Sequence, residues 1–101
     1  MNKEEVKKII RNAVEHDPHK SEIKKVSLFG SYLHENARAD SDVDILIEFK
    51  PKTSVGFFKL AEIYRNFKER LGKDVDLVTP PALSKYFRDE VIRSAEKIYE
   101  G

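Results

Sequence analysis

Three aspartates fall within the five-residue segment 40–44, which reads Asp-Ser-Asp-Val-Asp, and no basic residue follows before Lys50. The β-branched residues and the period near two over 42–49 predict a strand, which places Asp42 and Asp44 on one face, roughly 6.5–7 Å apart along the backbone. Two carboxylates held so close repel each other, and a divalent cation with oxygen ligands relieves that repulsion. The pattern therefore indicates a metal site, with a solvated acidic turn at the start of a strand as the alternative.

A second candidate group lies at the end of an apolar segment, Val26 to Phe29, where Gly30 and Ser31 follow. A glycine at such a turn allows backbone N–H groups to come close to a phosphate. The serine hydroxyl adds a donor, and the start of a following helix contributes a partial positive charge. An ordinary strand-to-helix turn is the alternative. A phosphate cradle and a carboxylate metal site in one small domain are the parts that phosphoryl or nucleotidyl transfer needs.

The elements that must position these groups follow from the spacing of apolar residues. The spacing predicts a mixed α/β domain over residues 1–101, in the order αβαβαβα. Its small sheet has three or more strands and is packed by about four helices. The expected ranges are 3–16, 26–29, 31–36, 42–49, 57–71, 74–78 and 84–99.

Two of the expected helices carry apolar stripes. The helix over 57–71 begins with Phe57 and Phe58, which we expect in the core rather than in a base-stacking platform. Gly72 stands where a helix C-terminal glycine belongs. The helix over 84–99 carries its apolar residues on one side: Phe87, Val91, Ile92, Ala95 and Ile98.

Composition excludes several classes of function. The chain has 101 residues, 40% of them hydrophobic and 37% charged, with a formal net charge of +1 and no cysteine. The lack of cysteine excludes disulfides, Cys-ligated zinc and a thiol nucleophile, and the balanced charge does not fit a dedicated nucleic-acid binder. The polar N-terminus predicts no signal peptide, and no apolar run approaches the roughly 20 residues of a membrane span. We therefore expect a cytoplasmic protein.

The spacing of the chemical groups resembles a known signature. Gly30-Ser31, ten intervening residues, and then Asp42-Val43-Asp44 are similar to the G-S-x10-D-x-D motif of the polymerase-beta-type nucleotidyltransferase superfamily. The fuller string resembles the minimal, single-domain branch of that superfamily, the MNT family. It reads Leu28-Phe29-Gly30-Ser31, Ala37-Arg38 and Ser41-Asp42-Val43-Asp44-Ile45. The likeness covers nearly the whole chain, since the order of the elements also fits.

The resemblance implies a mixed sheet whose first two strands run antiparallel, so that the Gly-Ser turn lies beside the aspartate pair. It also implies a third carboxylate on a neighbouring strand, and Asp76 is the matching position. Asp74 shares a face with Asp76 by alternation but lies nearer the loop, so we prefer Asp76. Arg38, in the loop before the acidic strand, either reaches a phosphate with its planar fork or is solvated.

By the same resemblance, the implied activity is a Mg²⁺-dependent nucleotidyl transfer from ATP. One or two Mg²⁺ ions would be bound, and the third carboxylate would either share the second ion or act as general base. The implied residues are Asp42, Asp44 and Asp76 for the metal and catalysis, and Gly30, Ser31 and Arg38 for the nucleotide.

Members of the MNT family are commonly paired with a small helical HEPN protein, a ribonuclease toxin, and transfer AMP from ATP onto one of its tyrosines. The resemblance therefore implies a protein adenylyltransferase that serves as antitoxin of a type VII-like toxin–antitoxin pair. Two alternatives stay open. One is a non-catalytic antitoxin or scaffold of the same fold, and the other is a nucleotidyltransferase for a small molecule. Homo- or hetero-oligomers are compatible with either.

Overall fold

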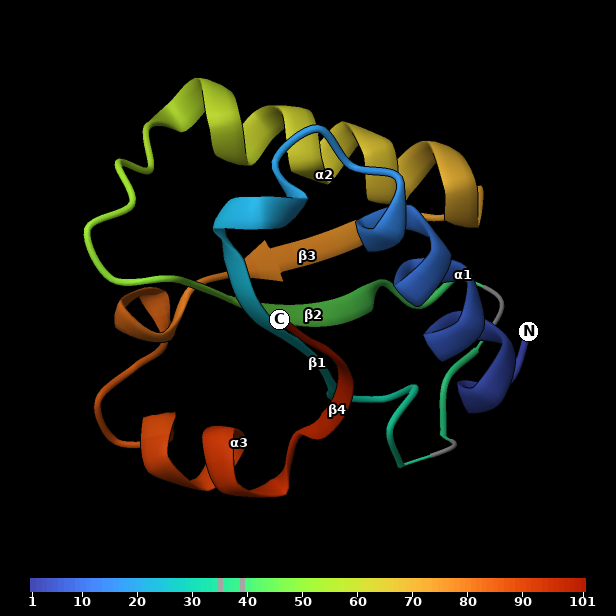
Figure 1. Cartoon of the computed structure of the whole chain (residues 1–101). Helices are drawn as coiled ribbons and strands as arrows, with labels where there is room; N and C mark the ends of the chain where they lie inside the picture. The colour runs from blue at the N-terminus through green and yellow to red at the C-terminus, as the bar shows by residue number, and fades with distance from the viewer. Residues whose placement is uncertain (35, 39) are drawn as a thin grey trace.

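Residues 1–34, 36–38 and 40–101 are described in a computed structural model of the chain (Figure 1). No helix among these residues combines the length and the apolar character that a bilayer crossing requires. The described residues form the elements α1 (Lys3–Glu15), η1 (Lys20–Glu22), β1 (Ile23–Phe29), β2 (Val43–Phe49), α2 (Phe57–Leu71), β3 (Val75–Val78), η2 (Pro80–Ala82), α3 (Arg88–Ser94) and β4 (Glu96–Glu100), where η marks a short 3₁₀ turn.

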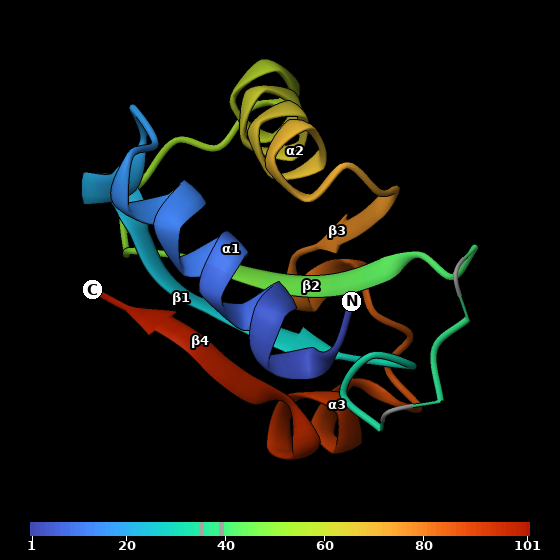
Figure 2. The ribbon, with the colours of Figure 1, turned by 90° about the vertical axis from the view of Figure 1, so that its right-hand side faces the viewer.

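The strands form one mixed sheet in the order β3-β2-β1-β4. β1 runs antiparallel to both β2 and β4, whereas β2 and β3 are parallel. Helices α1 and α2 cover one face of the sheet, and α3 lies on the opposite side (Figure 2). The expected mixed α/β class and the antiparallel arrangement of the first two strands are thus confirmed.

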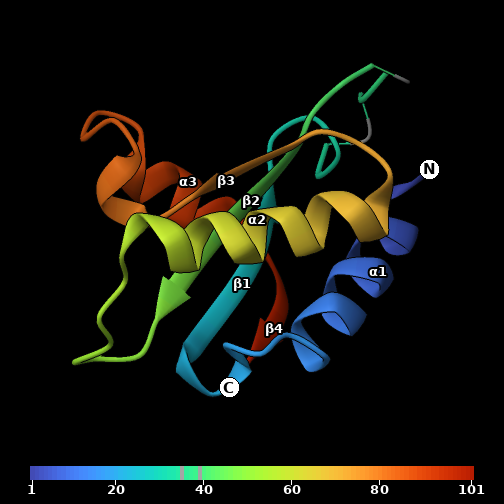
Figure 3. The same cartoon turned by 90° about the horizontal axis from the view of Figure 1, so that it is seen from above.

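The core lies between the sheet and the two covering helices, of which α2 crosses over the strands when seen from above (Figure 3). Helix α1 begins where the Asn2 side chain accepts a hydrogen bond of 2.9 Å from the backbone N–H of Glu5, a typical N-cap. Helix α2 ends at Gly72, which has a φ of 67° and donates its N–H to the Lys68 carbonyl at 2.9 Å. The fully buried residues of β2 on this face are Val43, Ile45 and Ile47.

The predicted helix over 31–36 is wrong for the described residues. Residues 31–34 form a turn closed by hydrogen bonds from the N–H groups of Leu33 and His34 to the Gly30 carbonyl, at 3.1 and 3.3 Å. Glu35 lies outside the described residues. A single turn does not continue as a helix because nucleation fixes several residues for very few hydrogen bonds.

The predicted helix over 84–99 is also wrong at its C-terminal end. The helix ends at Ser94, and Ala95 is extended, with a ψ of 140°. The remaining residues form β4, which pairs with the free edge of β1 and buries Ile98 in the core. Long-range strand pairing outweighs the local helical pattern here, since helix propensity is worth only a fraction of a kcal/mol per residue.

The two phenylalanines at the start of α2 are not core residues, contrary to the sequence prediction. Phe57 is 79% exposed and Phe58 is 80% exposed, and their rings form an edge-to-face pair with centroids 5.7 Å apart. The buried stripe of α2 consists of Ile63, Phe67 and Leu71, and it leaves out the first turn of the helix.

Candidate active site

The sheet register brings the Gly-Ser turn beside the acidic strand. Phe29, the last residue of β1, pairs with Asp44 of β2, so the turn that follows β1 lies next to Asp44. The Ser31 backbone lies close enough to the Asp44 carboxyl to act on its pKa, in the downward direction. Two segments that are separate in sequence are therefore joined at one end of the sheet.

Gly30 could not be replaced by another residue without disturbing Asp44. Its φ is 77°, in the left-handed region that favours glycine. A Cβ at this position would lie 2.8 Å from the carboxyl carbon of Asp44 and would overlap the carboxylate itself. The glycine is required both by the backbone conformation and by the close approach of the acidic side chain.

The turn uses two of its described N–H groups within the protein. The N–H groups of Leu33 and His34 both donate to the Gly30 carbonyl. The expected phosphate cradle therefore has fewer free N–H donors than the sequence suggests. The Ser31 hydroxyl is a further donor that this turn could offer to a phosphate.

The parallel pairing of β2 and β3 adds the third carboxylate. Asp44 pairs with Asp76 in the register, so both side chains extend from the same face of adjacent strands. Val43 and Ile45, the neighbours of Asp44, are fully buried beneath α1 and α2, so this face is the one opposite the covering helices. Asp42 is exposed and immediately precedes β2.

Asp44 carries the electrostatic signature of a crowded acidic site. The pKa of Asp44 is raised to about 6. Burial is the largest cause, followed by the negative charges of Asp76 and then Asp42. The Ser31 backbone acts in the opposite direction. At neutral pH Asp44 is mostly ionised and is repelled by two neighbours.

The donor set fits Mg²⁺ better as a partial site than as a complete protein cage. Among the described residues, no three carboxylate or imidazole groups lie close enough together to hold a metal ion by themselves. Mg²⁺ usually binds one or two carboxylates and completes its shell with water and substrate phosphates. Asp42 and Asp44 provide such carboxylates, and a cation there would relieve the repulsion around Asp44.

The structure separates the two β3 candidates. Asp74 precedes β3 and is held by contacts of its own: its carbonyl accepts the Val43 N–H at 2.9 Å, and its exposed carboxylate pairs with Lys68 at 3.2 Å. Asp76 lies within β3 and influences Asp44 electrostatically. Asp76 is therefore the nearer of the two to Asp44, and its role in the reaction stays a prediction.

Arg38 lies in the loop that leads to Asp42. Its backbone N–H donates to the Ser41 hydroxyl at 2.8 Å, and its carbonyl accepts the Ser41 N–H at 3.0 Å. The Arg38 side chain is exposed. Ala39 lies outside the described residues.

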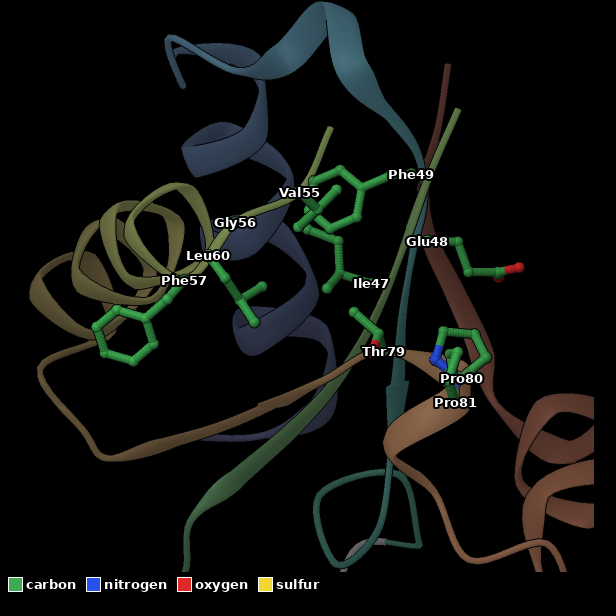
Figure 4. Close-up of a pocket in the computed structure, with 10 residues that line it drawn as sticks. All are labelled: Ile47, Glu48, Phe49, Val55, Gly56, Phe57, Leu60, Thr79, Pro80 and Pro81. Atoms are coloured by element: carbon green, nitrogen blue, oxygen red, sulfur yellow. The ribbon is translucent and has the colours of Figure 1, made fainter. Parts of the chain in front are cut away.

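A hollow of about 500 Å³ lies elsewhere, at the far end of β2 (Figure 4). It is bounded by residues of the β2 end, the start of α2 and η2, among them Phe49, Leu60 and Pro80. Neither Asp44 nor Asp76 lines it. Sequence reasoning did not find this hollow, because it joins three segments that no local pattern connects.

The family model described as polymerase beta nucleotidyltransferase matches residues 4–101. The chain belongs to this nucleotidyltransferase family. This nucleotidyltransferase is 33% identical over 96 residues to a Methanocaldococcus jannaschii protein provisionally named as a protein adenylyltransferase, across 94% of this chain and 96% of that protein. It is 35% identical over 71 residues to the protein adenylyltransferase MntA of Thermococcus cleftensis, across 70% of each chain.

The fold of this nucleotidyltransferase also resembles a solved structure. The match is to a chain in the complex of a tri-AMPylated Shewanella oneidensis HEPN toxin with an MNT antitoxin, with a TM-score of 0.59 and 21% identity. It covers 99% of this chain and 71% of that chain. The resemblance inferred from the sequence is confirmed at the level of family and fold, and the roles of the individual site residues stay predictions.

Proposed function

We propose that this nucleotidyltransferase transfers AMP from ATP to a tyrosine hydroxyl of a HEPN-type toxin, in a Mg²⁺-dependent reaction, and thereby acts as an antitoxin. The observation that carries the proposal is the register that aligns the Gly-Ser turn, Asp44 and Asp76 at one end of three adjacent strands. Relatives named as protein adenylyltransferases support the reaction class. The AMPylated HEPN toxin bound to an MNT antitoxin of the same fold supports the acceptor.

In this proposal the chain binds the nucleotide through its turn and its carboxylates. The Ser31 hydroxyl donates to the terminal phosphates, and the exposed Arg38 side chain supports them from the adjoining loop. Asp42 and Asp44 would hold Mg²⁺, which would supply positive charge to neutralise the phosphates. Because the pKa of Asp44 is about 6, its ionised form dominates at pH 7 and above.

The transfer is an in-line displacement at the α-phosphorus. The tyrosine oxygen forms the new P–O bond, and the bond from the α-phosphorus to the bridging oxygen breaks, so that diphosphate leaves with the electron pair. Asp76, one strand away from Asp44, accepts the proton of the tyrosine hydroxyl. The reaction needs no reactant besides ATP and the acceptor.

The test is mass spectrometry of a candidate HEPN-type protein after incubation with the chain, ATP and Mg²⁺. We expect an added AMP on a tyrosine, and the variant combining Asp42→Asn with Asp44→Asn should lower its formation by about 100-fold or more. Asp74→Asn is the matched control, since this carboxylate pairs with Lys68 outside the site. A stable complex without added AMP would instead favour a binding-only antitoxin. Modification of a small molecule alone would favour a small-molecule nucleotidyltransferase.

Asp76 is tested separately because its proposed role differs from metal binding. Asp76→Asn should lower the rate of transfer by roughly 100-fold while ATP affinity changes much less, since a proton acceptor acts only in the transition state. Single-turnover rates and ATP titration measure the two quantities. A loss of affinity that exceeds the loss of rate would make Asp76 a ligand for the nucleotide complex.

A further inference from the structure

The segment around the start of α3 exposes large apolar side chains. We define the α3 surface as Tyr86, Phe87 and Ile92, which are 81%, 61% and 37% exposed. No residue of α3, all of which are described, is buried. The apolar stripe that sequence periodicity finds in this segment therefore does not contribute a buried side chain to the core until Ile98.

Hydrogen bonds fix the backbone of the segment that carries the exposed α3 surface. The Ser84 carbonyl accepts hydrogen bonds from the N–H groups of Phe87 and Arg88, at 3.0 and 2.9 Å. The Arg88 guanidinium donates to the carbonyls of Leu83 and Pro81, at 3.0 and 3.3 Å. These bonds connect the start of α3 to η2 and the residues just after it, and η2 in turn follows β3.

The α3 surface and the candidate active site share one side of the sheet. Helix α3 lies on the side opposite α1 and α2 (Figure 2), and the Asp44 side chain extends from that same face. The exposed pair Phe57 and Phe58 differs in this respect, since it belongs to α2 on the covered side. Of the two aromatic surfaces, the α3 surface is the one on the side of the sheet from which Asp44 extends.

We infer that the α3 surface docks the acceptor protein and holds its tyrosine over the active-site carboxylates. This inference rests on the proposed function, in which the acceptor is a folded protein. A single tyrosine side chain contributes little binding energy by itself, so a protein acceptor needs a second contact area near the reacting group. Exposed aromatic side chains are the residue type that most often supplies such energy.

The charges around the surface define the partner further. Lys85 lies over the Tyr86 ring, with its ammonium 5.4 Å from the centroid, and Arg93 lies in the last turn of α3. Asp89 and Glu90 lie in its first turn. The complementary partner surface has an apolar centre and a rim with charges of both signs, which is typical of protein–protein interfaces.

A second copy of this chain is the less suitable occupant. Because α3 lies on the same side of the sheet as Asp44, a copy seated there would compete with an acceptor that approaches this side. The acceptor itself has to approach this side to react. A single interface on this side of the sheet could therefore both bind the acceptor and orient its tyrosine.

The experiment compares two matched double variants of the full chain. The α3 variant carries Tyr86→Ser and Phe87→Ser, and the control carries Phe57→Ser and Phe58→Ser. All four side chains are more than half exposed, so both variants should retain the unfolding temperature of the wild type. Affinity for the candidate HEPN-type protein is measured by isothermal titration calorimetry, and ATP affinity is measured in a separate titration.

The α3 variant should bind the HEPN-type protein at least about tenfold more weakly, while its ATP affinity remains unchanged. The control should bind both like the wild type. Unchanged HEPN affinity of the α3 variant, or a loss confined to the control, would overturn the inference. So would dimers of the wild type that dissociate only in the α3 variant.

Failure of docking and failure of the proposed reaction are distinguishable. The variant with Asp42→Asn and Asp44→Asn should still bind the HEPN-type protein with full affinity, because it keeps the α3 surface. If the wild type binds through α3 but transfers no AMP, the docking inference stands and the proposed function falls. If transfer occurs equally well in the α3 variant, the proposed function stands and the docking inference falls.

Discussion

Gly30 is required both by its left-handed backbone conformation and by the lack of space for a Cβ. Gly72 is required only by its backbone conformation. Both have positive φ values, 77° and 67°. A Cβ on Gly30 would overlap the Asp44 carboxylate, whereas a Cβ on Gly72 would have nothing within 4 Å. The two glycines thus separate the cost of the left-handed backbone from the cost of disturbing the site.

We predict that Gly30→Ala abolishes AMP transfer and lowers the free energy of unfolding by more than about 2 kcal/mol. The left-handed backbone alone costs roughly 1–2 kcal/mol for a residue with a Cβ, and displacement of Asp44 adds to it. Gly72→Ala should pay only the backbone cost and retain transfer. Urea unfolding and the transfer assay check both, and equal activity of the two variants would contradict the close contact at Asp44.

The ionisation of Asp44 should make the protein less stable as pH rises from about 4 to about 6. The folded protein keeps a proton on Asp44 up to a pKa of about 6, whereas the unfolded chain releases it near 3.9. The folded state therefore binds more protons in this window, and the free energy of unfolding falls as pH increases.

Asp44→Asn removes this dependence. At pH 7 the variant should be more stable than the wild type by about 1 kcal/mol, a value reduced for the partial solvent exposure of the group, and at pH 4 the difference should disappear. Urea unfolding at several pH values measures it. A variant less stable than the wild type at pH 7 would show that the interaction with the Ser31 backbone outweighs the repulsion.

Among the elements, the C-terminal segment shows most clearly how a free strand edge redirects the chain. Arg11 donates to the Ile98 carbonyl at 2.9 Å, and Lys3 and Lys7 pair with Glu96 at 3.2 Å each. Helix α1 thus holds β4 against β1. This arrangement requires the segment to be extended from Glu96, although its apolar spacing also suits a helix.

The two isoleucines of that segment should respond differently to truncation. Ile98→Ala should lower the free energy of unfolding by roughly 2–5 kcal/mol, because Ile98 is only 3% exposed in β4 and leaves a cavity. Ile92→Ala, on the exposed α3 surface, should change it by less than about 1 kcal/mol. Thermal and urea unfolding measure both values, and equal losses would indicate a continuous helix that buries both side chains.

For the whole molecule, nucleotide and metal should stabilise the fold together rather than separately. ATP alone brings negative phosphates to three carboxylates, whereas Mg²⁺ bridges the two sets of charges. At a Mg²⁺-ATP concentration near 100 times its Kd, the free energy of unfolding should rise by about 2.7 kcal/mol, which corresponds to roughly 10–20 °C in Tm.

Thermal unfolding with ATP and Mg²⁺, and with ATP and EDTA, measures this coupling. The chelated sample should show only a small part of the shift, and the variant with Asp42→Asn and Asp44→Asn should show little in either condition. An equal shift in the presence of EDTA would mean that the nucleotide binds without the carboxylate metal site.

The parts that follow from local sequence are those whose determinants are neighbours along the chain. The Asn2 cap and the apolar period predicted α1, and the alternation over 42–49 predicted β2. Gly30-Ser31 and the Asp42-Val43-Asp44 triplet gave the family resemblance, because the motif is a spacing and needs no coordinates. The antiparallel pairing that joins them came from that resemblance rather than from the pattern itself.

The amino-acid sequence by itself determined the nucleotidyltransferase family and the position of the acidic strand, and it named the candidate residues for the chemistry. Only the tertiary structure decided the burial of Asp44, its alignment with Asp76, the change from helix to strand before Ile98 and the exposure of Tyr86 and Phe87. The physical reason is that desolvation, strand register and edge pairing depend on segments far apart in the chain. The apolar periodicity of a sequence is the same whether that face is buried in the core or stays exposed and binds another protein.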